Sequence, residues 1–337
     1  MTVISSTDTD KYVQWIENGI ADDYINYYDY NELQGIKCIG YGAFGIVYQA
    51  TLESSDTVVA LKSFEFNNCV MKEIVNEIQL LRNVNHHKNI IQFFGITKRK
   101  DNENMNPDYL LILEYADSGT LRNYLKKNFT KLDWNIKLQF AIQISNAVSC
   151  MHQKGIIHRD LHSNNILIHQ NMIKIADFGL SRRIEEVSSN NKDIFGILPY
   201  IDPQLLKDQA NDGKKYKANK KSDVYSVGVL LWEISSGRVP FESDDTLGLT
   251  LEILNGKRET PIANTSIDYC NIYKRCWEDN PDDRPNIQQV LSDLKLINLD
   301  TNEMETCENT FENDIRHNNN NNSIDNNGSL NSNSTLI

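Results

Sequence analysis

The sequence predicts an α+β chain with two lobes, a small strand-rich lobe followed by a larger helical one. Short runs of β-type residues dominate the chain up to about residue 114. Beyond residue 117, long segments carry apolar residues at helical spacing instead. Apolar residues make up 40% of the 337 residues, which is enough for a packed core. We therefore place the boundary between the lobes near residues 114–119.

The small lobe is expected to hold several strands and one main helix. Before it, residues 11–30 carry apolar side chains at roughly helical spacing, which predicts one or two short helices. The main helix is expected over residues 70–83, where apolar side chains share one face. The polar residues 98–108 are interpreted as a hairpin loop. The expected strands are residues 35–39, 45–50, 58–64, 90–96 and 110–114.

The larger lobe is expected to consist mainly of helices. From about residue 300 the chain becomes polar and rich in Asn, and such a segment cannot bury enough apolar surface to offset the cost of ordering it. The predicted helices are residues 121–127, 135–154, 222–236, 247–254, 267–277 and 286–296. The expected division is an acidic, partly helical extension (1–32), a small lobe (33–116), a large lobe (117–297) and a disordered tail (298–337).

The net charge of −12 lies in the two flanks of the chain. Residues 1–34 and residues 298–337 each hold seven acids and one base, a net charge of −6 apiece, so the remainder is neutral. This distribution argues against nucleic acid or an anionic membrane as the main partner. The chain has no apolar run long enough to span a membrane and no signal-peptide pattern. Its six cysteines show no C-x-x-C spacing, so we expect free thiols and a cytoplasmic location.

Two polar motifs in the larger lobe suggest phosphoryl transfer. Residues 158–165 read His-Arg-Asp-Leu-His-Ser-Asn-Asn, and an Asp-Phe-Gly motif begins at Asp177. Transfer of a phosphoryl group requires a base for a hydroxyl proton and oxygen-bearing side chains that hold Mg²⁺. Asp160 is the candidate base, and Asn165 and Asp177 are the candidate metal ligands. The alternative, that these residues only form turns, is disfavoured because several motifs agree in order.

A glycine-rich segment in the small lobe is a candidate phosphate-binding loop. Gly40, Gly42, Gly45 and Val47 fit the pattern G-x-G-x-x-G-x-V. Glycine lets the backbone approach phosphate oxygens closely. An ordinary β-hairpin and a dinucleotide-binding turn are the alternatives. The second should open a helix, whereas this loop lies between two strand-like runs.

Lys62 ends the run Val-Val-Ala-Leu-Lys, which is similar to the V-A-I-K strand that positions a phosphate-binding lysine. In a partly apolar cleft such a lysine needs a carboxylate partner. Glu77, on the following helix, is the preferred candidate. Glu73 lies one turn earlier on a similar face and is the alternative.

Together these motifs resemble the protein-kinase family over about residues 33–297. Residues 223–228 fit the D-x-W/Y-S-x-G helix start, and residues 276–285 fit the segment C-W-x-x-x-P-x-x-R-P. The last form is similar to the tyrosine kinases and the tyrosine-kinase-like group. The distance from Glu77 to His86 or His87 also fits the family, whereas that from Glu73 does not.

The resemblance implies a bilobal kinase fold, ATP and Mg²⁺ as cofactors, and a protein substrate. Lys62 would contact the α- and β-phosphates, and the residues Asp160, Asn165 and Asp177 would keep the roles given above. The adenine site would comprise Val47, Ala60 and Leu167 on the ring faces, Leu113 at the back, and backbone groups of Glu114 and Ala116 at the ring edge.

The sequence departs from the family pattern at three positions. His162 stands where Lys, Arg or Ala is usual, and Ile197 replaces a common Thr. Gln204 replaces the Glu of the A-P-E motif, which in the family pairs with the arginine matching Arg284. Gln204 can hydrogen-bond Arg284 but cannot neutralise it. We expect Asp202 to supply part of the missing charge.

Two further segments carry open alternatives. Ser188 and Ser189 are either regulatory phosphorylation sites, whose phosphates would pair with Arg159, or unmodified loop residues. The tyrosines of residues 24–30 are expected to pack a helix on the small lobe rather than to be phosphorylated.

The sequence therefore predicts an ATP-dependent protein kinase that modifies Ser or Thr, with tyrosine or dual specificity left open by His162 and Ile197. The alternative is a catalytically inactive scaffold of the same fold. A dinucleotide-binding enzyme is a more distant alternative, because the βαβ context is missing. Oligomeric state and pathway are not predicted.

Overall fold

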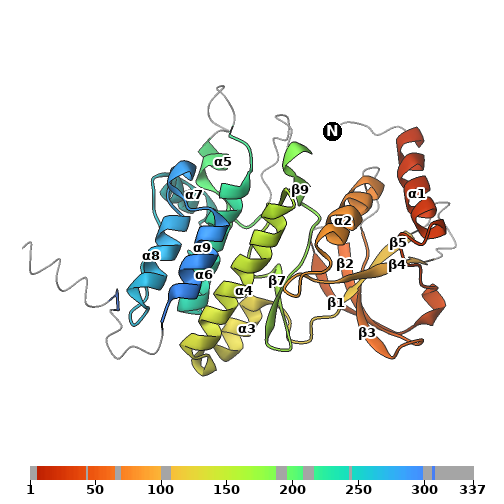
Figure 1. Cartoon of the computed structure of the whole chain (residues 1–337), viewed down its shortest axis with the longest axis horizontal. Coiled ribbons are helices and arrows are strands. Elements are labelled where there is room, and N and C mark those ends of the chain that lie inside the picture. Colours follow the sequence, from red (N-terminus) through yellow and green to blue (C-terminus); the bar gives the residue numbers. More distant parts are fainter. Residues whose placement is uncertain are drawn as a thin grey trace, which may run out of the picture.

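The computed structural model describes residues 6–42, 45–64, 70–99, 108–186, 196–207, 216–242, 245–298 and 306–307. Figure 1 shows a β-sheet with α1 and α2 at one end of the molecule and a bundle of helices at the other. The prediction of a bilobal α+β fold is confirmed. Among the described residues, no helix has the length and apolar character needed to cross a membrane.

The small lobe is built on one five-stranded antiparallel sheet in the order β1-β2-β3-β5-β4. Alternate residues of β5 point to opposite faces: Leu111 and Leu113 join the main core beneath α2, whereas Leu110 and Ile112 join a second apolar cluster. The sheet is therefore covered on both faces. Its strands are β1 (Leu33–Gly42), β2 (Gly45–Leu52), β3 (Thr57–Lys62), β4 (Phe93–Arg99) and β5 (Asp108–Glu114).

Strand β4 begins and ends three residues later than expected. Its first residue is fixed by Asn85, whose side chain bonds both the N–H and the carbonyl of Phe93. Ile90, expected in this strand, instead makes an isolated parallel bridge with Ile175 of the other lobe. The predicted loop at 98–108 is thus partly strand, and residues 100–107 lie outside the described part of the chain.

Two helices accompany the sheet. Helix α2 (Val70–Val84) matches the expected main helix, and its apolar Ile74, Ile78 and Leu81 are buried. Before the sheet lie one long helix, α1 (Ser6–Ala21), and a single 3₁₀ turn, η1 (Tyr30–Glu32). The helical spacing read in residues 11–30 therefore belongs to one helix that starts earlier and ends sooner.

The larger lobe surrounds α6, which is buried all round from Ser222 to Ser236. This helix starts two residues earlier than predicted, because Asn219 and Ser222 form a reciprocal capping box. It ends at Gly237, whose φ of 68° favours glycine. The other helices are α3 (Leu121–Asn128), α4 (Trp134–Gln153), α5 (Pro203–Lys207), α7 (Thr246–Leu254), α8 (Ile267–Cys276) and α9 (Ile287–Leu296).

Short strands and 3₁₀ turns lie between the helices of this lobe. The strands are β6 (Ile156–Ile157), β7 (Ile166–His169), β8 (Met172–Ile175) and β9 (Arg182–Arg183). The turns are η2 (Phe129–Lys131), η3 (Ile184–Glu186), η4 (Leu198–Tyr200) and η5 (Pro281–Asp283).

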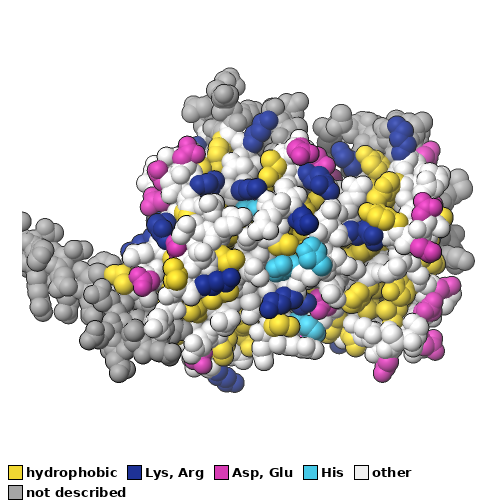
Figure 2. All heavy atoms as spheres, in the orientation of Figure 1, with side chains coloured by type: hydrophobic (Ala, Val, Ile, Leu, Met, Phe, Trp, Pro, Cys, Tyr) yellow, Lys and Arg dark blue, Asp and Glu magenta, His cyan; other side chains and the backbone are white. Residues whose placement is uncertain are grey.

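Figure 2 shows acidic side chains along the outer edge of the small lobe and basic ones scattered over the larger lobe.

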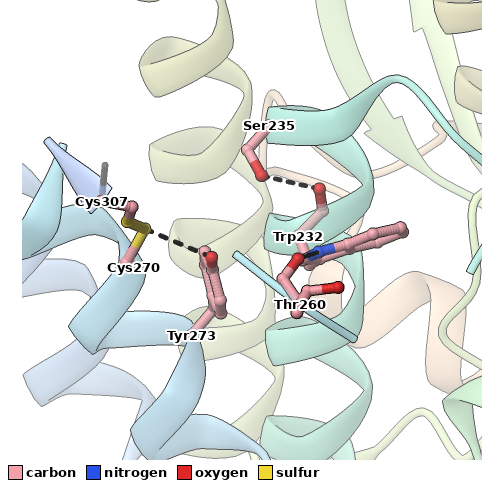
Figure 3. The surroundings of a disulfide bond; sticks show 6 residues. All are labelled: Trp232, Ser235, Thr260, Cys270, Tyr273 and Cys307. Carbon is pink, nitrogen blue, oxygen red and sulfur yellow. Dashed lines mark hydrogen bonds between the residues drawn. A yellow bond between two sulfur atoms is a disulfide. The ribbon is translucent and has the colours of Figure 1, made fainter. Parts of the chain in front are cut away.

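A disulfide corrects the expectation that all cysteines are free thiols. Cys270 of α8 is bonded to Cys307, and Tyr273 donates its hydroxyl hydrogen to the Cys270 sulfur (Figure 3). The neighbouring Thr306 makes an isolated antiparallel bridge with Ser266. The free-thiol prediction is wrong for these two residues because the fold brings tail and helix together. The rest of the predicted tail beyond Asn298 lies outside the described residues.

Candidate active site

Lys62, the last residue of β3, lies between two acidic side chains from different elements. Its Nζ is 2.8 Å from both carboxylate oxygens of Glu77, on α2, and 2.9 Å from Oδ1 of Asp177, which follows β8. Glu73, the alternative partner, instead pairs with Arg182 at 2.9 Å. The fold thus brings together a buried cation and two carboxylates distant in sequence.

The charges of Lys62 and Asp177 support each other against the cost of burial, whereas burial raises the pKa of Glu77 despite the neighbouring ammonium. Burial lowers the pKa of Lys62, but the carboxylates of Asp177 and Glu77 outweigh it and hold that pKa above the ordinary lysine range. Burial raises the pKa of Asp177, and the Lys62 ammonium overcomes this and holds that pKa below its usual value. The lysine and this aspartate are therefore both charged at neutral pH.

Asp160 and Asn165 lie in one loop and are directly bonded. The Asn165 side-chain amide donates to the Asp160 carbonyl at 3.0 Å and to its Oδ2 at 2.9 Å. The other carboxylate oxygen, Oδ1, is buried and has no hydrogen-bond partner in the described structure. Gly196 faces it with a φ of 110°, and a Cβ there would lie 2.9 Å from Oδ1. This carboxylate oxygen therefore has no hydrogen bond in the described structure, and the backbone of Gly196 approaches it closely.

His162, the first departure from the family pattern, lies beside the same oxygen. Its Nε2 is 3.4 Å from Asp160 Oδ1, and its ring is tilted against that of Tyr200 at 6.0 Å between centroids. The side chain is buried, and its Nδ1 has no hydrogen-bond partner in the described structure. His162 therefore faces the carboxylate of Asp160, the candidate base, rather than solvent.

The loop carrying Asp160 is held by a buried acid on α6. Asp223 accepts the N–H groups of His158 and Arg159, both at 2.9 Å, and lies 2.8 Å from Nε2 of His152. Arg159 has a φ of 70°, a strained value for a side chain of its size. The two hydrogen bonds to Asp223 hold this strained turn in place.

The same loop contacts the segment of Asp177. His158 Nε2 lies 3.2 Å from the Ala176 carbonyl, and its ring meets Phe178 edge-on. Ser181 donates to the His158 carbonyl at 3.1 Å. The base candidate and the metal-ligand candidate therefore share one rigid support.

The glycine-rich segment and the adenine-site candidates line the sheet beside Lys62. Gly45 has a φ of 148°, and a Cβ there would lie 2.0 Å from the Ser63 carbonyl, so only glycine fits. Gly40 and Gly42 belong to β1, and Val47 is directly opposite Lys62 in the sheet. The loop tip, residues 43–44, lies outside the described structure.

The other adenine-site candidates come from both lobes. Ala60 of β3 is paired with Leu113 of β5, while Leu167 lies in β7 of the larger lobe. Glu114 donates its N–H to the Gln92 carbonyl, so one of its two backbone polar groups is already used. Ala116 follows the end of β5 in the connection between the lobes.

Residues 33–294 match the family model described as protein tyrosine and serine/threonine kinase. The chain belongs to the protein kinase family. A putative serine/threonine-protein kinase/receptor of Acanthamoeba polyphaga mimivirus is 30% identical over 79% of this chain and 15% of its own length. A probable LIM domain-containing serine/threonine-protein kinase of Dictyostelium discoideum is 31% identical over 77% of this chain and 38% of its own.

A serine/threonine/tyrosine-protein kinase of Arabidopsis thaliana is 32% identical over 66% of this chain and 54% of its own length. The kinase thus matches only part of each of these three relatives, between 15% and 54% of their length.

The third departure from the family pattern is compensated in the structure of this kinase. Arg284 Nη1 and Nη2 lie 2.7 and 2.9 Å from the two carboxylate oxygens of Asp202, and both side chains are fully buried. The expectation that Asp202 supplies the missing charge is confirmed. The Gln204 amide, which could have bonded Arg284, donates instead to the Asp279 carbonyl at 2.9 Å. Tyr216 also donates to Asp202.

A second buried acid, Glu233, was not identified from the sequence. It lies 3.0 Å from Arg122 and accepts hydrogen bonds from Ser163, at 2.8 Å, and Tyr200. The network joins the loop that carries Asp160 to the segment after Gly196. Its position could have been noticed in the sequence, because Glu233 is a single carboxylate in the apolar part of α6. A carboxylate in such a helix is expected to be buried and therefore to have hydrogen-bonding or charged partners. His152 had no such signal.

Other predicted features lie outside the described residues. Ser188 and Ser189, the candidates for regulatory phosphorylation, are among residues 187–195, which the structure does not describe. Burial lowers the pKa of Arg159, and the nearby charge of Arg182 adds to this effect. Because residues 187–195 are not described, phosphorylation of Ser188 or Ser189 and pairing of the phosphate with Arg159 stay predictions.

Asp223→Asn is expected to destabilise the kinase and to change its response to acid. The variant retains one acceptor oxygen in place of two charged ones, which should lower the unfolding free energy by about 3 kcal/mol. Although burial raises the pKa of Asp223, the hydrogen bond from His152 and the neighbouring charges and N–H groups hold it below the usual 3.8. Its stabilising effect is therefore present above that value and is lost as the pH falls through the folded-state pKa.

Urea unfolding of wild type and variant between about pH 7 and about pH 3 would test this. The difference between the proteins should shrink as the pH falls. Asp282→Asn, at an exposed aspartate of η5, is the matched control. A difference that stays constant with pH would contradict the assignment.

Proposed function

We propose that this kinase transfers the γ-phosphoryl group of ATP to serine or threonine hydroxyls of a protein. The observation that carries the proposal is the convergence at one site of Lys62, Glu77 and Asp177, next to a loop in which Asn165 orients Asp160. Phosphoryl transfer uses each of these groups, which supports catalysis over a role as a scaffold.

The side chains present fit the cofactors that protein kinases use, ATP and Mg²⁺. Mg²⁺ prefers oxygen ligands, and Asn165 and Asp177 offer an amide oxygen and a carboxylate. When bound, Mg²⁺ would neutralise charge on the phosphates. Lys62 would contact the α- and β-phosphates, and Gly40, Gly42 and Gly45 would let the backbone approach them.

In the proposed reaction, Asp160 Oδ1 receives the proton of the acceptor hydroxyl. Asn165 occupies the other carboxylate oxygen, so we assign the proton to Oδ1, which has no hydrogen bond in the described structure and lies 3.4 Å from His162 Nε2. Gly196 keeps the space beside that oxygen free of a side chain. Since phosphoryl transfer depends mainly on positioning and charge neutralisation, this orientation contributes directly to the rate.

The adenine site is proposed between the lobes. Val47 and Ala60 would cover one ring face and Leu167 the other, with Leu113 at the back. Backbone groups of Glu114 and Ala116 would bond the ring edge; for Glu114 this leaves the carbonyl, because its N–H is already used.

Serine and threonine are the proposed acceptors because the relatives are named as serine/threonine kinases, one of them also as a tyrosine kinase. The segment at 276–285 favours membership of the tyrosine-kinase-like group. His162 and Ile197 leave tyrosine as a possible second acceptor. The loss of the family's Glu at Gln204 would favour an inactive scaffold, but the buried Asp202–Arg284 pair supplies a carboxylate for the arginine and so supports the active reading. A protein substrate and a role in cytoplasmic signalling complete the proposal.

Asp160→Asn tests the proposed function. The full chain is incubated with radiolabelled ATP, Mg²⁺ and a generic protein substrate, and the labelled amino acids are identified after hydrolysis. We expect label on serine or threonine in wild type, and a loss of about 10²–10⁴-fold in the variant because the base is gone. Asp282→Asn, at an exposed aspartate, should keep wild-type activity. Equal incorporation by wild type and Asp160→Asn would contradict catalysis at this site.

A further inference from the structure

The segment before the sheet, residues 12–28, docks onto the small lobe next to the helix that carries Glu77. Figure 1 shows α1 beside α2, above the ends of β4 and β5. Ile16 and Ile25 are buried and belong to the same apolar cluster as Ile74 and Ile78 of α2. We call residues 12–28 the N-terminal brace. The apolar spacing in this segment therefore serves packing on α2.

Glu17, a partly exposed acid of α1, connects the brace to two strands of the sheet. Glu17 is 2.8 Å from Nζ of Lys98 on β4 and accepts the hydroxyl hydrogen of Tyr109 on β5. Burial raises the pKa of Glu17, but these two partners outweigh it and hold that pKa below the usual value. Helix α1 is thus attached to the sheet by a charged contact as well as by apolar packing.

The end of the brace extends the sheet at its open edge. Strand β4 is the last strand in the order, so its outer side lacks a neighbouring strand of the sheet. Ile96 donates its N–H to the Asn26 carbonyl at 2.9 Å, and Tyr28 donates to the Ile96 carbonyl at 3.0 Å. Gly95 permits this contact: a Cβ there would lie 2.3 Å from Asn26 O and 2.9 Å from Tyr28 Cε2.

A third contact reaches the last turn of α2. The guanidinium of Arg82 lies 3.8 Å from the ring centre of Tyr24, a cation–π contact. The brace therefore holds α2 by its apolar face and by its C-terminal end, and it is itself fastened to β4 and β5.

We propose that the N-terminal brace positions α2 so that Glu77 stays bonded to Lys62. The inference rests on the proposed phosphoryl transfer, because the bond between Glu77 and Lys62 is part of that site. Residues of the brace are positioning residues, since none touches the reacting groups. A displacement of α2 by about 1 Å would suffice to misplace Lys62 and lower the rate by up to about 10²-fold.

Gly95→Ala in the full chain unseats the end of the brace without touching the active site. We expect the kcat for phosphate transfer to fall by about 10-fold to 100-fold. Hydrogen exchange in residues 70–84 should become faster, while exchange in α9 stays unchanged. Gln14→Ala, on the exposed side of α1, is the control and should match wild type. Wild-type kcat and wild-type exchange in α2 for Gly95→Ala would overturn the proposal.

Ile16 supplies a second, independent variant in case Gly95→Ala does not fold. Ile16→Ala removes a fully buried side chain at the α1–α2 contact, whereas Ile16→Val keeps most of it. We expect the loss of kcat and the faster exchange in α2 for the first and near-complete recovery for the second. The double variant with Gly95→Ala should lose less than the product of the two single losses, because both act on one docking event.

The hydrogen-exchange measurement on α2 distinguishes a failure of this inference from a failure of the proposed function. A wild-type protein without phosphate transfer would contradict the function, and exchange in α2 would then still decide whether the brace holds that helix. An active wild type whose Ile16→Ala variant keeps both kcat and exchange would overturn the brace and leave the function intact.

Discussion

Lys62→Met is expected to abolish phosphate transfer and to destabilise the small lobe. Lys62 is the cation between the buried carboxylates of Glu77 and Asp177, and its removal leaves two like charges close together. Loss of a charge-stabilising group at the site should reduce single-turnover transfer by about 10³-fold. Breaking a buried ion pair should lower the unfolding free energy by about 3–5 kcal/mol, measured by urea unfolding.

The pH dependence of this loss follows from the same geometry. Without the ammonium, burial and mutual repulsion raise the folded-state pKa of the carboxylate pair above the unfolded value. Stability of the variant should therefore fall as the pH rises through that pKa, and the difference from wild type should be larger at about pH 8 than at about pH 5. Lys72→Met, at an exposed lysine of the same helix as Glu77, should change neither transfer nor stability. Transfer by Lys62→Met within a few-fold of wild type would exclude Lys62 from the reaction.

Asp202→Ala should reduce stability and phosphate transfer nearly as much as Lys62→Met, although Asp202 is not part of the proposed phosphate-binding site. It leaves the guanidinium of Arg284 fully buried and unpaired from its carboxylate, at a cost of about 3–5 kcal/mol in unfolding free energy. The affected segment carries Gly196 and Tyr200, which lie against Asp160 and the Glu233 network, so phosphate transfer should fall with stability.

A double-mutant cycle isolates this pair. Asp202→Asn and Arg284→Met together should be less destabilising than the sum of the single changes, because no uncompensated charge remains buried. Gln204→Glu added to Asp202→Ala should recover part of the stability, because it returns a carboxylate two residues away. Asp268→Ala, at an exposed aspartate of α8, is the control. Zero coupling between the two positions would show that their contact contributes nothing to stability.

Much of the fold and of the chemistry could be read from local patterns. The segments around Lys62, Asp160 and Asp177 are contiguous, and each contains the residue types that its role requires, so their order along the chain implied one kinase site. Helix α2 was predicted within one residue because the burial of its apolar face is a local periodic property. The candidates for ATP, Mg²⁺ and the acceptor base were therefore determined by the sequence alone.

Only the tertiary structure decided which distant side chains meet. Asp202, and not Gln204, bonds Arg284. The backbone after Gly196 directs the Asp202 carboxylate toward the buried guanidinium, whereas the Gln204 amide lies against Asp279. The brace on α2, the supports of Glu233 and Asp223, and the later start of β4 likewise depend on long-range packing. Local patterns encode the chemistry of a residue and the face it presents. They do not encode which distant residue it contacts across the core, because such contacts depend on the packing of all the elements together.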